Sequence, residues 1–369
     1  MIILGLDIGG ANTKAALIYF KDKEIIECFS YIEYFPFWEK NLNDFPQMLK
    51  RIVENVVEKN NDKLDNVDYI SITMTAELSD AFQTKKEGIL AILKALKQVF
   101  DTNKMFFINN DRNFIDFESV KSNYLSIAAS NWVSTSLFLG NFQSQCILID
   151  GGSTTIDIIP IFNSIPVSQG KDDISRMLNH ELVYTGGLRA TIPSITHLVP
   201  YQDKLVRISF EKFALISDIH LILGNITEDK YLNDTADNRS KSLEDCYARL
   251  SRIICMDKEM IMKDDLNKIA EYIYEKQLEI LSDEIQQFMA ALIVRYPEFE
   301  NNPKFIITGL SADFLIRKTL LELGYNNILS YEEITNIPDQ ISSSAFAVAG
   351  AFYYQLKGFI KYGNPNSNI

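Results

Sequence analysis

The chain has 369 residues, 47% of them hydrophobic and 23% charged, a composition typical of a globular protein long enough for two domains. Its formal net charge of −13 argues against nucleic acid as a general partner, because phosphate backbones attract a positive surface. No apolar run is long enough to span a bilayer, no signal-peptide pattern opens the chain, and the four cysteines lack CxxC spacing, so we expect a cytoplasmic protein with reduced thiols and no membrane partner.

The first predicted element is a β-hairpin, with an apolar run at 2–6, a glycine-rich turn and an alternating run at 15–20. The turn region supplies candidate phosphate ligands: Gly9, Gly10, Asn12, Thr13 and Lys14. Glycines let backbone N–H groups approach phosphate oxygens, and the preceding acid, Asp7, suits a Mg²⁺ that holds phosphate in turn. The alternative is a plain hairpin in which Lys14 points to solvent at the strand edge.

The next segments predict an α/β domain. A third strand is expected at 25–31, and an aromatic loop at 34–38 then either lines a substrate pocket or packs at a domain edge. Further expected elements are a helix around 48–57, a strand at 69–74, a helix at 87–100, a strand at 105–108 and a helix at 121–139. Three strands followed by alternating helices and strands indicate a mixed sheet covered by helices.

A second glycine hairpin is predicted at 147–162, where an apolar run leads through Asp150 into another strand. Its turn contains Gly151, Gly152, Ser153, Thr154 and Thr155. In both hairpins a threonine stands three residues after the second glycine, Thr13 in the first and Thr155 in the second. Two such hairpins far apart in the chain predict a duplicated fold with a ligand held between its halves.

The remaining chain predicts an insertion and the end of the second half. Residues 168–300 are not explained by the duplication and are expected to set substrate specificity. This insertion combines a loop-rich part at 168–206 with helices at 213–223 and 264–295. After it come a strand at 305–308, a turn at Gly309, a helix at 313–323, a strand at 328–330 and a helix at 342–353. The predicted domains are therefore 1–139 plus 345–369, and 140–344.

The two hairpins and the late strand–turn–helix resemble the actin/hexokinase/chaperone-ATPase superfamily. The resemblance implies an α/β fold of duplicated ribonuclease-H-like domains, as in actin-like ATPases, with a cleft between them and an insertion in the second. In that superfamily the hairpins and the late turn clasp a nucleotide. The turn at 307–311 has one glycine, Gly309, where nucleotide-binding members commonly have two, which disfavours ATP.

A closer resemblance, over most of the chain, is to the hydantoinase-A-like archaeal proteins, once labelled as tetrahydromethanopterin-linked C1-transfer pathway proteins. Seven short segments carry it, at 4–14, 73–80, 128–132, 150–157, 181–189, 235–237 and 249–257. The archaeal members resemble enzymes of methanofuran biosynthesis. The implied activity is a transferase that joins 5-(aminomethyl)-3-furanmethanol diphosphate to γ-glutamyltyramine through an ether bond and releases diphosphate.

For this reaction the two turns and Gly309 are expected to hold the diphosphate together with Mg²⁺. Asp7 and Asp150 are the candidate catalytic carboxylates and, with Asp157, the candidate metal ligands. Asp157 is expected to share a strand face with Thr155. Glu77, just past the strand at 69–74, is the candidate base for the phenol, and the alternative is an acid at a helix N-terminus.

The substrate contacts are expected to be Asn131, Arg189, Arg249 and Arg252, with the arginines pairing with glutamyl carboxylates. Arg249 and Arg252 lie one helical turn apart, so a solvated helix face is the alternative. His180, His197 and His220 have no metal-ligand spacing and are expected to be structural.

Two other functions stay open from the sequence. One is an ATP-dependent kinase or hydantoinase/oxoprolinase-type enzyme of the same superfamily, and the other is a non-catalytic regulator that senses a nucleotide. A homo-oligomer is also left open.

Overall fold

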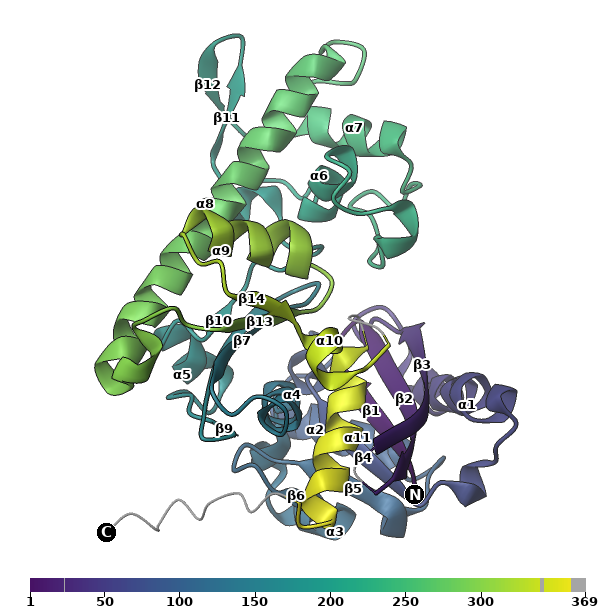
Figure 1. Cartoon of the computed structure of the whole chain (residues 1–369). Coiled ribbons are helices and arrows are strands. Elements are labelled where there is room, and N and C mark those ends of the chain that lie inside the picture. The colour runs from purple at the N-terminus through teal and green to yellow at the C-terminus, as the bar shows by residue number, and fades with distance from the viewer. Residues whose placement is uncertain (23, 339–341, 360–369) are drawn as a thin grey trace. The chain divides into compact units, whose positions relative to one another are not determined.

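The computed structural model describes residues 1–22, 24–338 and 342–359, which form two compact units (Figure 1). The first unit contains residues 1–148, 159–176 and the chain from 329 onward, and the second contains residues 149–158 and 177–328. The domain boundaries expected from the duplication stay a prediction, and residues 360–369 of the first predicted domain lie outside the described residues.

The first unit is built on a sheet with the strand order β3-β2-β1-β4-β5-β6. Its strands are β1 (Ile2–Ile8), β2 (Asn12–Lys21), β3 (Glu24–Tyr34), β4 (Tyr69–Met74), β5 (Met105–Ile108) and β6 (Phe114–Asp116). The first three form an antiparallel meander, and β4 and β5 extend it in parallel from β1. The strands expected in this half are confirmed. β6 was missed because three residues are too few for an alternation pattern.

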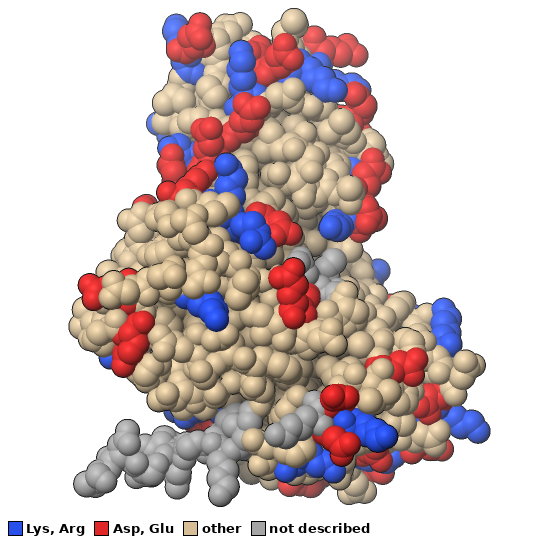
Figure 2. All heavy atoms as spheres, viewed as in Figure 1, with Lys and Arg blue, Asp and Glu red and all other residues tan. Residues whose placement is uncertain are grey.

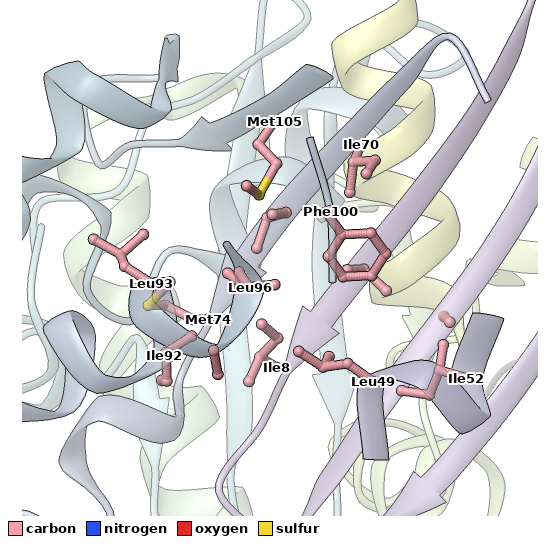
Figure 3. Close-up of a cluster of buried hydrophobic side chains, with 14 of the residues drawn as sticks. Ile8, Leu49, Ile52, Ile70, Met74, Ile92, Leu93, Leu96, Phe100 and Met105 are labelled. Atoms are coloured by element: carbon pink, nitrogen blue, oxygen red, sulfur yellow. The ribbon is translucent and has the colours of Figure 1, made fainter. Parts of the chain in front are cut away.

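Helices cover both faces of this sheet. They are α1 (Phe45–Val56), α2 (Lys85–Leu96), α3 (Phe117–Ser122), α4 (Asn131–Gly140) and α11 (Ser343–Leu356). Of the other helices near the unit boundaries, α10 (Tyr331–Thr335) contacts α4, and the chain passes from the first unit to the second within α5 (Asp173–Leu178). Alternate residues of β1, such as Leu6 and Ile8, belong to the apolar core shared with α1 and α2 (Figure 3). On the other face, α11 packs against β1 and α4 so closely that a Cβ on Gly5 would lie 2.1 Å from the Ala345 carbonyl oxygen.

The helix expected at 121–139 is only partly correct. The structure ends α3 at Ser122, passes through a 3-10 turn at Tyr124–Ile127, and begins α4 at Asn131. Between them Ala128 forms a parallel bridge with Met74, and Ala129 adopts a positive φ of 48°. Pairing at the end of β4 therefore overrides the helical pattern, and no local signal in the sequence reveals that contact.

The second sheet repeats the order of the first. Its strands are β7 (Cys146–Gly151), β8 (Ile156–Phe162), β9 (Ile165–Pro166), β10 (Leu182–Val183), β13 (Phe305–Thr308) and β14 (Ile328–Ser330). The order is β10-β8-β7-β13-β14, with β9 attached to β8. Leaving out β6 and β9, both sheets run third, second, first, fourth, fifth in chain order. The predicted fold, duplicated ribonuclease-H-like α/β domains, is confirmed.

The insertion lies between β10 and β13, where the first half has α1. It contains β11 (Leu198–Tyr201), β12 (Lys204–Arg207), α6 (Ile216–Ile222), α7 (Leu243–Arg252) and α8 (Lys263–Arg295), and α9 (Lys318–Glu322) follows β13 after a π-helical turn. Apolar residues spaced by three or four along α8, including Ile269 and Ile273, pack with α6 and α7. The helices expected at 213–223 and 264–295 are confirmed with small shifts, and α7 was not predicted as an element.

The surface carries both signs of charge. On the face shown in Figure 2, Lys and Arg side chains are interspersed with Asp and Glu. Among the described residues, even the long α8 is too polar to cross a bilayer, and no other helix has the necessary length and apolar character.

We expect Gly5→Ala to lower the thermal unfolding midpoint, because the added Cβ would push α11 away from β1. Overpacking of this kind costs about 1–3 kcal/mol. Gly10→Ala is the matched control, since the nearest atom to its Cβ would be Trp38 Cζ3 at 3.9 Å. Calorimetry of both variants checks the prediction, and equal midpoints for Gly5→Ala and the wild type would contradict it.

Candidate functional site

Both glycine hairpins close with the same backbone hydrogen bond. In the first, Gly9 N–H donates to the Asn12 carbonyl at 3.0 Å, and in the second, Gly152 N–H donates to the Thr155 carbonyl at 2.9 Å. Each is a four-residue turn that follows an Asp by two positions. The shared sequence feature is therefore Asp-x-Gly.

This register corrects one expectation. Asn12 is the counterpart of Thr155, so the predicted equivalence of Thr13 and Thr155 is wrong by one residue, because the first copy has one more residue between the Asp and the glycine pair. Thr13 lies in β2 opposite Ile8 and is fully buried. Thr155 directly precedes β8, Asp157 is a mostly buried residue of β8, and a strand face shared by the two stays a prediction.

The carbonyls of the first turn are held by the chain that follows β3. Phe35 N–H donates to the Ala11 carbonyl at 2.8 Å, and Phe37 N–H donates to the Gly10 carbonyl at 3.1 Å. The peptide bonds of the described residues are trans, and in a trans peptide the N–H points opposite to the C=O. The N–H groups of Ala11 and Asn12 therefore point away from this loop, the arrangement that binds an anion.

Phe35 and Phe37 belong to the aromatic loop for which pocket lining and packing were both open. Both side chains are buried. The ring of Phe37 lies 4.9 Å from that of Phe45 and 5.9 Å from that of Phe82, centroid to centroid. Packing is confirmed for these two residues, and it fixes the backbone that holds the first turn.

The second turn is held in the same way by the chain that follows β10. At 2.9–3.0 Å, Gly186 N–H donates to the Thr154 carbonyl, Gly187 N–H to that of Gly152, and Leu188 N–H and Arg189 N–H to that of Ser153. The N–H groups of residues 153–155 consequently point away from this loop. A Cβ on Gly186 would lie 2.6 Å from Thr154 carbonyl carbon, so the close approach requires glycine.

Two predicted residues lie at this second turn. Arg189 reaches it through Nη1, which donates to Thr154 Oγ1 at 3.3 Å. Gly309 has a φ of 89°, and a Cβ there would lie 2.7 Å from Asp150 Oδ1. The structure thus brings Arg189, Gly309 and Asp150 to one hairpin, and their roles toward a ligand stay predictions. Ser311, whose N–H donates to the Gly151 carbonyl at 3.0 Å, was not predicted.

Asp7 is held by a residue that sequence reasoning missed. Ser344, at the start of α11, donates its hydroxyl to Asp7 Oδ2 at 2.5 Å, and Lys14 Nζ lies 3.4 Å from the same oxygen. Lys14 also donates to Ser344 Oγ at 3.3 Å, so it contacts the site rather than only solvent. Ser344 stands 330 residues from Lys14, and its one sequence signal is the serine run 342–344 before a small-residue helix. Asp7 Oδ1 is buried and has no hydrogen-bond partner among the described residues.

Glu77 is almost fully buried, at 1% exposure, in a 3-10 turn at Ala76–Leu78. Its Oε1 accepts from Ala129 N–H at 3.0 Å, whereas Oε2 has no partner among the described residues. Burial raises the pKa of Glu77 to about 7, and Lys85 and the Ala129 amide offset part of that rise. Asn131 follows Ala129 by two residues at the start of α4, so Glu77 contacts the segment that leads to Asn131.

Thr75 connects the turn of Glu77 to the first hairpin. Its N–H donates to the Ile8 carbonyl at 2.9 Å, and its Oγ1 would lie 3.7 Å from a Cβ placed on Gly9. β1 and β4 are neighbours in the sheet, which is why the ends of both strands supply candidate site residues at the same edge.

Arg249 and Arg252 lie in the insertion rather than at a hairpin. Arg249 is fully buried, with Nη2 at 2.7 Å from Asp218 Oδ1 and Nη1 at 3.2 Å from Asp237 Oδ1. Arg252 pairs with Asp237 at 2.9 Å. A solvated face is therefore wrong for Arg249. A contact with substrate carboxylates stays a prediction for both arginines, and for Arg249 it requires these ion pairs to exchange.

The candidate metal ligands do not form a ready cluster. In the part of the chain that the structure describes, no three His, Cys, Asp or Glu side chains are gathered as a metal site. His220 is buried between the rings of Phe314 and Tyr274, and His180 pairs with Glu284 at 2.7 Å.

The sequence model that describes the hydantoinase/oxoprolinase family matches residues 68–355, which are most of the chain. The chain belongs to the hydantoinase/oxoprolinase family. Its described fold and both hairpins are thus features of a family member, and the resemblance drawn from the short segments is confirmed.

Two relatives are each matched over most of their own length. A (4-{4-[2-(γ-L-glutamylamino)ethyl]phenoxymethyl}furan-2-yl)methanamine synthase from Methanocaldococcus jannaschii is 37% identical over 357 residues, which cover 96% of this chain and 99% of that protein. A synthase of the same name from Methanococcus vannielii is 31% identical over 212 residues, 57% of this chain and 91% of that protein.

Solved structures match more distantly. The activator of the 2-hydroxyisocaproyl-CoA dehydratase from Clostridium difficile has a TM-score of 0.44 and 10% identity, covering 99% of this chain and 100% of that one. The ethanolamine utilization protein EutJ from Carboxydothermus hydrogenoformans has a TM-score of 0.45 and 11% identity, covering 95% and 90%. The fold assignment rests on the strand order of the two sheets.

We expect Glu77→Gln to raise the thermal midpoint above pH 7 and to leave it unchanged below pH 4.5. The folded pKa of about 7 exceeds the ordinary 4.5, so the stability contributed by neutral Glu77 is complete below 4.5 and is lost as pH rises through 7. Gln stays neutral throughout, and its advantage reaches up to about 3 kcal/mol.

Thermal unfolding from pH 4 to pH 8 measures this difference, with Glu54→Gln on the exposed side of α1 as the control. A midpoint difference that does not grow with pH would contradict the buried, partly protonated state of Glu77.

Proposed function

We propose that the protein is a transferase that joins 5-(aminomethyl)-3-furanmethanol diphosphate to γ-glutamyltyramine, forms an aryl–alkyl ether and releases diphosphate. The observation that carries this proposal is the 37% identity over 96% of the chain to a synthase whose name describes a phenoxymethyl link to a furan methanamine. The family match and two phosphate-type hairpins support it. On this proposal the protein acts on small molecules in the cytoplasm.

The reaction forms one bond and breaks one. The phenol oxygen bonds to the methylene carbon of the furan, the carbon–oxygen bond to diphosphate breaks, and diphosphate leaves with the electron pair. Positive charge grows on the furfuryl carbon and negative charge on the leaving group. Donors aimed at the diphosphate therefore lower the barrier, because they bind the transition state better than the substrate.

The turn amides are suited to this task. The N–H groups of Ala11 and Asn12, and those of residues 153–155, point away from the loops that hold their carbonyls. Lys14 adds a positive charge beside the first turn. Fixed donors of this kind need no reorganisation during the reaction, which is the condition for strong electrostatic stabilisation.

A Mg²⁺ ion fits this donor set. Asp7 offers a buried carboxylate oxygen that accepts no hydrogen bond from the residues described, and carboxylate oxygens are ligands that Mg²⁺ prefers. In the first unit Asp7 is the candidate ligand, and in the second unit Asp150 and Asp157 are the candidate ligands. When bound, Mg²⁺ neutralises charge on a leaving diphosphate.

Glu77 is the proposed base for the phenol. A phenol with an ordinary pKa near 10 is a weak nucleophile at neutral pH, and a base works best when its own pKa lies near the working pH. The raised pKa of Glu77, about 7, meets that condition, and its free Oε2 can accept the proton. Asn131, at the start of α4, is the proposed orienting contact.

The ATP-dependent alternatives have less support. The late turn carries Gly309 alone, whereas nucleotide-binding relatives in the superfamily commonly have two glycines there. A kinase, an ATP-dependent cyclic-amide hydrolase and a nucleotide sensor all require an adenosine site. The proposed transferase requires only the phosphate site.

We expect the purified protein to form the ether product from the furan diphosphate and γ-glutamyltyramine with Mg²⁺ and without ATP. Mass spectrometry detects the coupled product, and a colorimetric assay detects released phosphate after pyrophosphatase treatment. Turnover that appears only when ATP is added would reject the proposal in favour of the ATP-dependent alternatives. Nucleotide binding with no turnover of any kind would favour the sensor.

We expect Asp7→Asn to lose at least about 100-fold in kcat, because the carboxylate that would hold Mg²⁺ at the leaving group becomes a neutral amide of the same shape. Asn can still accept from Ser344, so the fold should persist. Asp65→Asn, an exposed residue of the same unit, is the control. Activity assays with circular dichroism check the pair, and full activity of Asp7→Asn would remove Asp7 from the site.

A further inference from the structure

The two turns are held by equivalent loops, but the loops are anchored differently. Buried phenylalanines anchor the loop at 35–37. The loop at 185–189 is anchored by Gln277, a fully buried residue of α8 in the insertion. Gln277 Nε2 donates to Thr185 Oγ1 at 3.0 Å and to the Gly186 carbonyl at 3.1 Å. The Gln277 amide therefore fixes the first residues of the loop that holds the second turn, and Ser217 N–H holds the Leu188 carbonyl farther along it at 3.2 Å.

His220 of α6 fixes the orientation of that amide. His220 Nε2 lies 3.0 Å from Gln277 Oε1, and an amide oxygen only accepts, so Nε2 carries the hydrogen. Asn225 Nδ2 then donates to His220 Nδ1 at 3.1 Å. Burial lowers the pKa of His220 to about 3, which keeps the ring neutral and Nδ1 able to accept. In this series of hydrogen bonds, the donor and the acceptor of each bond are therefore fixed.

We propose that Gln277 is a positioning residue for the leaving diphosphate. This positioning role rests on the proposed function. Gln277 fixes Thr185 and Gly186, Gly186 holds the Thr154 carbonyl, and the N–H groups of residues 153–155 are thereby aimed at the phosphate site. The insertion thus serves the reaction centre as well as substrate choice. A merely structural role for Gln277 would instead affect stability alone.

Two substitutions of Gln277 distinguish its donor contacts with the loop from its acceptor contact with His220. Gln277→Met removes both the donor and the acceptor in a side chain of similar length. Gln277→Glu keeps an acceptor for His220 but places a second acceptor against the Gly186 carbonyl. Gln286→Met is the matched control, since Gln286 is exposed on the same helix. Thr185→Val, which removes one acceptor and keeps the Gly186 contact, serves if the Gln277 variants do not fold.

The first measurement needs no ligand. Hydrogen–deuterium exchange should accelerate at least about fivefold in peptides covering 151–157 and 184–190 for Gln277→Met and Gln277→Glu, because a buried hydrogen-bonded loop is released. Gln286→Met should match the wild type. Unchanged exchange in both Gln277 variants overturns the proposal whatever reaction the protein performs.

The second measurement is ligand-specific. With Mg²⁺ present, calorimetry should show inorganic diphosphate binding about tenfold more weakly to Gln277→Met than to the wild type, and about threefold more weakly to Thr185→Val. In kinetics, KM for the furan diphosphate should rise while KM for γ-glutamyltyramine stays constant. Equal diphosphate affinity, or an equal rise in both KM values, overturns the positioning role.

Failure of the proposed function has a different signature. A wild-type protein that neither binds inorganic diphosphate nor forms the ether would reject that function and with it the aim of the amides at diphosphate. Wild-type turnover with unaltered behaviour of Gln277→Met would reject only the positioning role.

Discussion

The trans geometry of the peptide bond is the constraint on which the candidate site depends. A turn presents its N–H groups in one direction only if its carbonyls are held in the other. In this chain both turns meet that condition through the loop that follows the third strand of each sheet, at Phe35 and Phe37 in one half and at 186–189 in the other. The duplication therefore repeats a way of orienting backbone dipoles. In each copy the groups that hold the turn carbonyls are backbone N–H groups rather than charged side chains.

That constraint explains which parts of the fold the sequence could predict. Strand runs and glycine turns are local patterns, so both hairpins, the α/β class and the duplication could be predicted from them. The register of the turns could not be predicted, because the glycine pair follows the Asp directly in the second copy and after one further residue in the first. Only the closing hydrogen bonds at Asn12 and Thr155 show which residues correspond. The break before α4 also escaped prediction, since a bridge between Ala128 and Met74 decides it.

The residues of the candidate site also differ in whether a local sequence pattern reveals them. Asp7, Gly309 and Arg189 could be placed because they stand within or beside recognisable turns. Ser344 and Gln277 act across long sequence separations, 330 residues from Lys14 in one case and 92 from Thr185 in the other. A serine or glutamine in a helix carries no pattern that reveals such a partner. Arg249 shows the converse: its charge suggested a substrate contact, while burial beside Asp218 and Asp237 gives it two protein partners.

The two halves have also diverged in what anchors their turns. Aromatic packing at Phe35 and Phe37 is nondirectional and tolerates small shifts, whereas the hydrogen bonds from Gln277 fix both distance and angle. On the proposed function, a loop fixed by directional bonds would suit a turn whose amides face a leaving diphosphate. Oriented amides serve both phosphoryl transfer and the departure of a diphosphate, and only the atom under attack, phosphorus or carbon, differs between the two reactions.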